Sequence, residues 1–197
     1  MSIEQTLAFL GFATVVAITP GPSNVMLTVT GAVAGILRGL PCLVGVATSM
    51  ALVMFAVSFG LGAMILGHPT VVAVLKWCGA AFLLWLSWKI ATAAYGGAPD
   101  QGRPVGFREA FVFQWLNPKA WLVSTSASAA YLQAGGGALI QALWIAGLFF
   151  IVALPCGFVW LGFGAGVRGL LKSPERQRAF NVAMGALLAS SVVLFVS

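Results

Sequence analysis

The side chains best able to bind a ligand lie in two proline-containing stretches, each inside a long apolar run. The first stretch, at residues 19–24, reads Thr-Pro-Gly-Pro-Ser-Asn. The second, at residues 117–119, reads Asn-Pro-Lys, and Gln114 lies one turn before it. Proline lacks an N–H and clashes with the carbonyl group one turn back, so an α-helix must break at both places. Lipid cannot satisfy the freed backbone groups, so such breaks must face protein or a water-filled cavity.

The first break predicts a site for an anion. Neither Pro20 nor Pro22 can donate to the carbonyl group four residues earlier, so at least two acceptors are left free. A second half-helix starts beyond the break, and the N–H groups of about Ser23, Asn24 and Val25 lack partners within it. They carry the positive end of the helix dipole, which attracts a carboxylate or a phosphate.

Lys119 lies deep in its apolar segment, about 18 Å from Phe107 and thus close to the middle of a membrane. A cation at that depth is costly unless it is paired or hydrated. The four acidic residues all lie in flanks or first turns: Glu4, Asp100, Glu109 and Glu175. We therefore expect a substrate carboxylate at Lys119. The alternative is that Lys119 bonds to the carbonyl groups at Pro20 and Pro22 and clamps two helices together, and both roles can coexist.

These considerations give one candidate site with no catalytic residue and no metal. Asn24, Asn117 and Gln114 would accept from or donate to the amino group of a substrate. The serine-rich run at 124–128 either lines a pathway or bonds back to helix carbonyls. The candidate substrate-binding residues are Pro20, Gly21, Pro22, Ser23, Asn24, Gln114, Asn117, Pro118 and Lys119.

The composition indicates an integral membrane protein. Of 197 residues, 60% are hydrophobic and 7% are charged, against about 25% charged in a typical soluble domain. This length allows about six membrane spans of about 20 residues and almost nothing outside the membrane. The net charge of +6 comes from scattered basic residues, so it does not indicate nucleic-acid binding. The cysteines Cys42, Cys78 and Cys156 are far apart and predict packing rather than a disulfide or a metal cluster.

Six apolar segments separate at turn signals, at about 5–37, 40–66, 70–95, 107–132, 138–167 and 177–196. Basic residues flank the odd connections and are missing from the even ones: Arg38 in the first, Lys89, Arg103 and Arg108 around the third, and Arg168, Lys172, Arg176 and Arg178 in the fifth. By the positive-inside rule the odd connections are cytoplasmic and both termini lie outside. We expect no cleaved signal peptide, because the N-terminus has no basic region.

A shift of 98 residues suggests an internal repeat. It lays Pro20 on Pro118, Gly39 on Gly137, and segment 40–66 on 138–164. With three spans in each half, the second half must enter the membrane from the opposite side, as in many transporters. The expected fold is all-α and polytopic, with six transmembrane helices in a 3+3 inverted repeat and helices 1 and 4 broken. Its units are 1–95, a cytoplasmic linker at 96–106, and 107–197, and we expect one three-helix unit to rock against the other.

With these motifs, the chain resembles the lysine exporter (LysE/RhtB) family of amino-acid exporters over its whole length. The motifs are the stretch at 19–24, Arg-Gly-Leu at 38–40, Gly-Ala-Ala-Phe-Leu-Leu-Trp-Leu at 79–86, and Leu-Asn-Pro-Lys-Ala at 116–120. The resemblance implies efflux of amino acids from the bacterial cytoplasm, driven by the proton gradient or by exchange, and a homodimer. Residues 85–92 look most like those of cysteine and O-acetylserine exporters, whereas the Ser- and Ala-rich run after Ala120 departs from the more aromatic stretch common in the family.

We therefore predict an exporter of small neutral amino acids or derivatives, of the threonine/homoserine or cysteine/O-acetylserine type. It would be proton-coupled, lie in the bacterial inner membrane, and use no cofactor and no nucleic acid. A channel or another small-solute permease is the first alternative. An intramembrane enzyme is the second, but it would need a nucleophile with a base, or a metal cluster, and no histidine or carboxylate lies at membrane depth.

Overall fold

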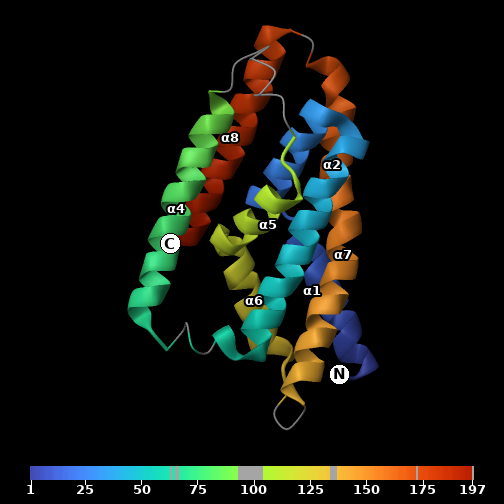
Figure 1. Cartoon of the computed structure of the whole chain (residues 1–197), viewed down its shortest axis with the longest axis vertical. Helices are drawn as coiled ribbons and strands as arrows, with labels where there is room; N and C mark the ends of the chain where they lie inside the picture. The colour runs from blue at the N-terminus through green and yellow to red at the C-terminus, as the bar shows by residue number, and fades with distance from the viewer. Residues whose placement is uncertain (63, 65–66, 93–103, 134–136, 172, 197) are drawn as a thin grey trace.

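The computed structural model describes residues 1–62, 64, 67–92, 104–133, 137–171 and 173–196. Every regular element within these ranges is a helix, as predicted (Figure 1). In chain order the elements are α1 (Ile3–Ile18), α2 (Pro22–Ala56), the π-helix η1 (Val57–Leu61), α4 (Pro69–Ala91), α5 (Phe107–Leu116), α6 (Pro118–Tyr131), α7 (Ala138–Val167), the 3₁₀ helix η2 (Arg168–Leu170) and α8 (Pro174–Val196). Most of the predicted linker at 96–106 lies outside the described residues.

Helix α2 consists of two antiparallel arms that meet at Gly35. This glycine has φ 79° and ψ −178°, which no helix contains. Thr30 Oγ1 lies 3.8 Å from Cys42 Sγ, although twelve residues of straight helix would separate them by about 18 Å. The chain therefore reverses at Gly35, as Figure 1 shows. From the sequence we placed this turn at Arg38, three residues too late. The apolar pattern continues past Gly35, although glycine is the residue type that adopts a positive φ without strain.

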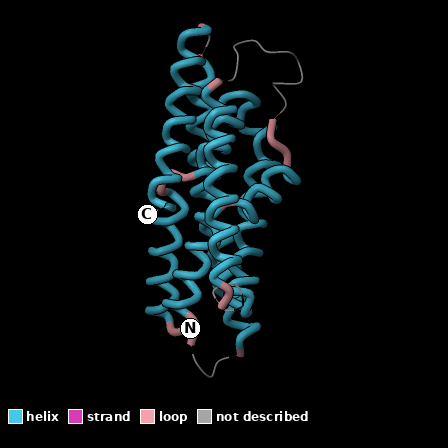
Figure 2. Tube along the Cα trace, turned by 90° about the vertical axis from the view of Figure 1, so that its left-hand side faces the viewer, coloured by secondary structure: helices cyan, strands magenta, loops and turns pink. Residues whose placement is uncertain are grey.

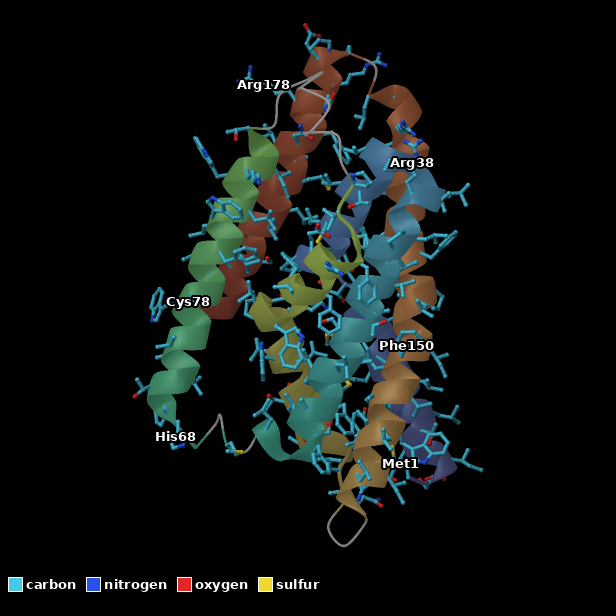
Figure 3. The ribbon with its side chains drawn as sticks, viewed as in Figure 1. Met1, Arg38, His68, Cys78, Phe150 and Arg178 are labelled. Carbon is cyan, nitrogen blue, oxygen red and sulfur yellow. The ribbon has the colours of Figure 1, made fainter. Side chains whose placement is uncertain are left out.

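Three helical stretches are long and apolar enough to cross a membrane: Pro22–Leu61, Val72–Ala91 and Ala138–Leu170. The first of them turns back at Gly35, so it is not a single span. Helix α1 is apolar but shorter. The helices run along one common axis (Figure 2). Met1 and His68 lie at one end of this bundle, and Arg38 and Arg178 lie at the other (Figure 3).

The helices pack mainly across the two predicted halves of the chain. Helix α2 packs against α7 and α5, α1 against α7, and α4 against α8. The contact between α2 and α7 is made by backbone: a Cβ added at Gly31 would lie 2.1 Å from the carbonyl oxygen of Leu161, and one added at Gly164 would lie 1.9 Å from that of Thr28. Glycine at these positions lets the two helices touch, as small residues do in membranes.

Only some of the glycines in these helices are packed against a neighbouring helix. Gly45 and Gly157 are also tightly packed, whereas a Cβ at Gly147 or Gly162 would meet nothing within 4 Å. The cysteines also differ in burial: Cys42 and Cys156 are buried, as predicted, and Cys78 is exposed. The prediction for Cys78 was wrong because sequence alone does not tell which face of α4 meets a partner helix.

Candidate functional site

The first helix break is closed by side chains that bond to its carbonyl groups. Thr19, Pro20 and Gly21 separate α1 from α2. Asn24 Nδ2 donates to the carbonyl oxygens of Ala17 at 3.1 Å and Thr19 at 2.8 Å. Lys119 Nζ reaches the same break from α6 and donates to Thr19 O at 2.8 Å, with Pro20 O at 3.5 Å. Two polar side chains thus donate to the carbonyl groups of Ala17, Thr19 and Pro20 at the break.

The second break, at Asn117 between α5 and α6, is closed by residues of those two helices. Asn117 Oδ1 caps α6 by accepting from the N–H of Lys119 at 3.1 Å. The N–H of Asn117 bonds to Gln114 O at 3.2 Å. Trp121 Nε1 donates to Trp115 O at 2.8 Å. In an unbroken helix this oxygen would accept from the N–H of Lys119, so the indole replaces that donor. These hydrogen bonds fix the orientation of α6 relative to α5.

Three polar side chains link the start of α2 to the second break. Ser23 Oγ donates to Gln114 Oε1. Asn117 Nδ2 donates to Ser23 Oγ at 3.0 Å and to Gln114 Oε1 at 2.9 Å. Gln114 and Asn117 are each only 2% exposed. Buried polar groups need such partners, and this cluster fixes the two breaks relative to each other.

The two half-helices that begin at the breaks differ in their free N–H groups. In α6, Lys119 bonds to Asn117 Oδ1 and Ala120 bonds to Asn117 O. In α2 no side chain caps Gly21, and the N–H groups of Ser23 and Asn24 have no acceptor within the part of the chain that the structure describes. The N–H of Val25, predicted to be free, bonds to Gly21 O at 3.0 Å. That prediction was wrong because the helical bond already forms at the fourth residue from Gly21.

A cavity of about 60 Å³ lies between the breaks. It is lined by Val16, Ala17, Gly21, Ser23, Asn24, Leu27, Val46, Met50, Gln114, Asn117, Lys119, Ala120, Val123, Phe149, Ala153 and Gly157. All six predicted site residues other than proline are in this lining.

The three predicted prolines do not line the cavity. Pro20 presents only its carbonyl oxygen toward Lys119. Pro22 is fully buried, and Pro118 packs against Gly79 of α4, where an added Cβ would lie 3.3 Å from the proline ring. The prolines therefore shape the site by breaking the helices.

The sequence missed the apolar part of the lining. Val46 and Met50 come from the second arm of α2, and Phe149, Ala153 and Gly157 come from α7. These residues carry no polar signal and are far in sequence from both breaks. Their one sequence cue was the shift of 98 residues that superposes the two segments containing them, which we interpreted as an internal repeat.

Lys119 is the one charged residue in the described lining of the cavity, and its side chain is partly buried. None of the described carboxylates pairs with it, and Asp100 lies outside the described residues. No metal-binding cluster of histidine, cysteine or carboxylate occurs in the described ranges. The clamp that we considered for Lys119 is present here, although it uses the carbonyl groups of Thr19 and Pro20 rather than those of Pro20 and Pro22.

Apolar helices around a small cavity with a single cation define a polytopic helical membrane protein with an internal polar site. The chain belongs to the LysE type translocator family, whose pattern matches residues 14–197. It is therefore a membrane amino-acid efflux transporter and not an enzyme. Members of this family lie in the plasma membrane.

Curated relatives cover most of the chain. It is 30% identical over 177 residues to the cysteine/O-acetylserine efflux protein of Salmonella choleraesuis (strain SC-B67). The match covers 88% of this chain and 85% of that protein. It is 28% identical over 192 residues to the protein of the same description from Escherichia coli (strain K12), with 94% of each covered. No solved structure matches the chain significantly.

Proposed function

We propose that this transporter exports small neutral amino acids or their derivatives, of the cysteine/O-acetylserine or threonine/homoserine type, and binds them in the cavity between the breaks. The observation that carries the proposal is that one cavity holds both the uncapped start of α2 and the side chain of Lys119. Both favour an anion, and an amino acid supplies one as its carboxylate.

The substrate carboxylate would be held by Lys119 and by the N–H groups of Ser23 and Asn24. Lys119 Nζ now bonds to Thr19 O and Pro20 O, and a carboxylate is a stronger acceptor for an ammonium group than a neutral carbonyl. Gly21 leaves room for this, because a Cβ there would lie 3.1 Å from Lys119 Nζ. The carbonyl oxygens released by Lys119 would then be free to accept from the substrate amino group.

The cavity favours a neutral side chain. A substrate with a basic side chain would bring a second positive charge beside Lys119, with no described carboxylate in the lining to pair with it. An acidic side chain would bring a second negative charge with no second cation in the described lining. An unpaired charge in such a site is costly, and the substrates for which the relatives are named, cysteine and O-acetylserine, agree with this preference.

The proposed architecture is six spans in a 3+3 inverted repeat, with units 1–95 and 107–197. Two contacts support the offset of 98 residues. Ser87 Oγ donates to Gly185 O at 2.7 Å, and Gly21 lies against the side chain of Lys119. The two residues of each pair are 98 positions apart and so occupy equivalent positions in the two repeats. Equivalent residues can touch only close to the symmetry axis that relates the repeats. The packing of α1 on α7 likewise corresponds to that of α5 on α2, and α4 pairs with its own equivalent α8.

The proposed orientation in a bacterial inner membrane has Arg38 and Arg178 at the cytoplasmic face and both termini outside. The basic residues at one end of the bundle support this orientation by the positive-inside rule (Figure 3). Proton coupling and a homodimer remain predictions from the family resemblance, and no described residue is assigned to either.

The test is efflux of labelled amino acids by cells or proteoliposomes containing Lys119→Met. We expect loss of nearly all transport with normal membrane insertion, because methionine keeps the packing of the lysine stem and removes the cation. The control is Lys89→Met, which removes a lysine that lies over the ring of Trp85, at 5.0 Å from its centroid, outside the cavity. Wild-type transport by Lys119→Met would remove the carboxylate site. Flux that follows concentration alone, whatever the proton gradient, would favour a channel.

A further inference from the structure

We infer that the apolar wall of the cavity selects the substrate side chain, and that Ala153 and Met50 set the length it accepts. This inference rests on the proposed function, since it concerns which amino acids the same site takes. The cavity lining divides by element, with polar groups at the two breaks and apolar groups on the second arm of α2 and on α7.

The apolar wall is formed by regularly spaced residues on two helices. On α7, Phe149, Ala153 and Gly157 follow one another at intervals of four residues, so they share one face of the helix. On the second arm of α2, Val46 and Met50 have the same spacing. A substrate anchored at the breaks by its amino and carboxylate groups must direct its side chain toward these two helices.

Two small residues of α7 have different roles in this wall. A Cβ at Gly157 would lie 2.5 Å from Leu43 Cδ1 and 3.2 Å from Leu27 Cδ1, so the wall is already closed there. Ala153 lines the cavity itself and carries only a methyl group. A longer side chain at position 153 therefore takes up volume that the substrate would occupy.

Met50 and Phe149 close the wall from α2 and α7. They are 6% and 3% exposed and belong, with Val123 and Ala153, to one core cluster. Methionine is flexible and fills irregular space, so its truncation leaves room without disturbing a rigid contact. Met50 is the position at which the cavity can be enlarged.

The size of the cavity sets the expected substrate. The cavity is small, about 60 Å³. We therefore expect it to favour a short, uncharged side chain, such as that of cysteine, serine or threonine, over the bulky side chains of leucine and phenylalanine.

The experiment compares transport of alanine, threonine, cysteine and leucine in proteoliposomes holding the wild type, Ala153→Val or Met50→Ala. We expect Ala153→Val to lower the ratio of threonine to alanine transport about tenfold and Met50→Ala to raise the ratio of leucine to alanine transport by a similar factor, since one methylene in an apolar pocket changes selectivity by about 10–200-fold. Ratios within one variant do not depend on how much protein inserts. The controls are Ala73→Val and Met64→Ala, two exposed positions outside the cavity.

The outcomes separate this inference from the proposed function. If the wild type transports none of the four amino acids, the proposed function fails and the inference fails with it. If the wild type transports them but both variants keep its ratios, the wall does not select the side chain, and the proposed function stands without it. If either ratio shifts as expected and the controls stay at wild type, the inference is supported.

Discussion

Lys119 Nζ donates to the carbonyl oxygen of Thr19 at 2.8 Å and so joins the break before α6 to the break before α2. The same oxygen accepts from Asn24 Nδ2, also at 2.8 Å. One backbone oxygen therefore accepts from side chains of both α2 and α6. An incoming carboxylate can take over the bond to Lys119 without leaving Thr19 O unsatisfied, because Asn24 still donates to it.

Gly21→Ala should weaken substrate binding by displacing Lys119. Gly21 has extended backbone angles, φ −174° and ψ 177°, so alanine meets no conformational strain there. Its Cβ would lie 2.9 Å from Lys119 Cδ, so the lysine stem must shift from its present position. We expect the KM for efflux to rise about tenfold, equal to about 1.4 kcal/mol, with a smaller change in the maximal rate.

The matched control for that prediction is Gly11→Ala, in the middle of α1, the helix that precedes the first break. A Cβ at Gly11 meets nothing within 4 Å, so its KM should stay at the wild-type value. Equal KM values for Gly21→Ala and Gly11→Ala would show that the position of the Lys119 stem does not limit binding.

Trp121→Phe should destabilise the second break. It keeps most of the edge-to-face packing with Trp115, whose ring centroid lies 5.9 Å away, but it removes the donor to Trp115 O. A fully buried carbonyl group left without a partner costs about 1–3 kcal/mol, and this bond is partly buried, so we expect a loss at the lower end of that range. The reciprocal variant Trp115→Phe loses only packing, so its free energy of unfolding in detergent should change less. Equal losses in the two variants would mean that the hydrogen bond contributes nothing.

Gly164→Ala should separate α7 from the first arm of α2. The added Cβ would lie 1.9 Å from Thr28 O and 2.7 Å from its carbonyl carbon, and backbone cannot move aside as a flexible side chain can. Such overpacking costs about 1–3 kcal/mol. Gly162→Ala, two residues away with nothing within 4 Å, should leave stability unchanged. Thermal unfolding of the purified proteins in one detergent compares the pair, and equal midpoints would contradict the close helix contact.

The polar half of the site could be predicted from sequence because its chemistry is local. Proline removes a donor wherever it occurs, so the breaks near Pro20 and Pro118 follow from the chain alone. Polar residues beside such breaks in an apolar run must serve the free backbone groups or a ligand. This reasoning identified Asn24, Asn117 and Lys119, all of which line the cavity.

The apolar half could not be predicted, because it depends on tertiary packing. Met50 and Ala153 belong to segments whose hydrophobicity is the same on faces toward lipid and toward protein, so the sequence does not reveal which face is inside. The turn at Gly35 was predicted at Arg38 for a similar reason, because apolar residues continue through the turn. Which side chain meets which is set by the backbone contacts at Gly31 and Gly164, and those appear only in three dimensions.

The packing also favours a different moving body from the three-helix repeat. Helix α2 is held to α7 by backbone contacts at Gly31 and Gly164 and to α5 by Ser49, whose Oγ donates to Phe111 O at 2.6 Å. These contacts join the two repeats to each other. Helices α4 and α8 pack mainly against one another and lie along one side of the bundle (Figure 1). We therefore predict that α4 and α8 move together against the other helices during transport.

Distances between spin labels separate the two kinds of motion. Labels on cysteines at Leu37, Trp88 and Val182, which are 82%, 70% and 48% exposed, report on α2, α4 and α8 in a background with the exposed Cys78 replaced by serine. If α4 and α8 move together, the distance from Trp88 to Val182 stays constant when substrate is added and the distance from Trp88 to Leu37 changes. If the repeats rock as units, the reverse holds, because Leu37 and Trp88 then belong to one body. A constant Trp88–Leu37 distance with a changing Trp88–Val182 distance would therefore restore the three-helix unit as the moving part.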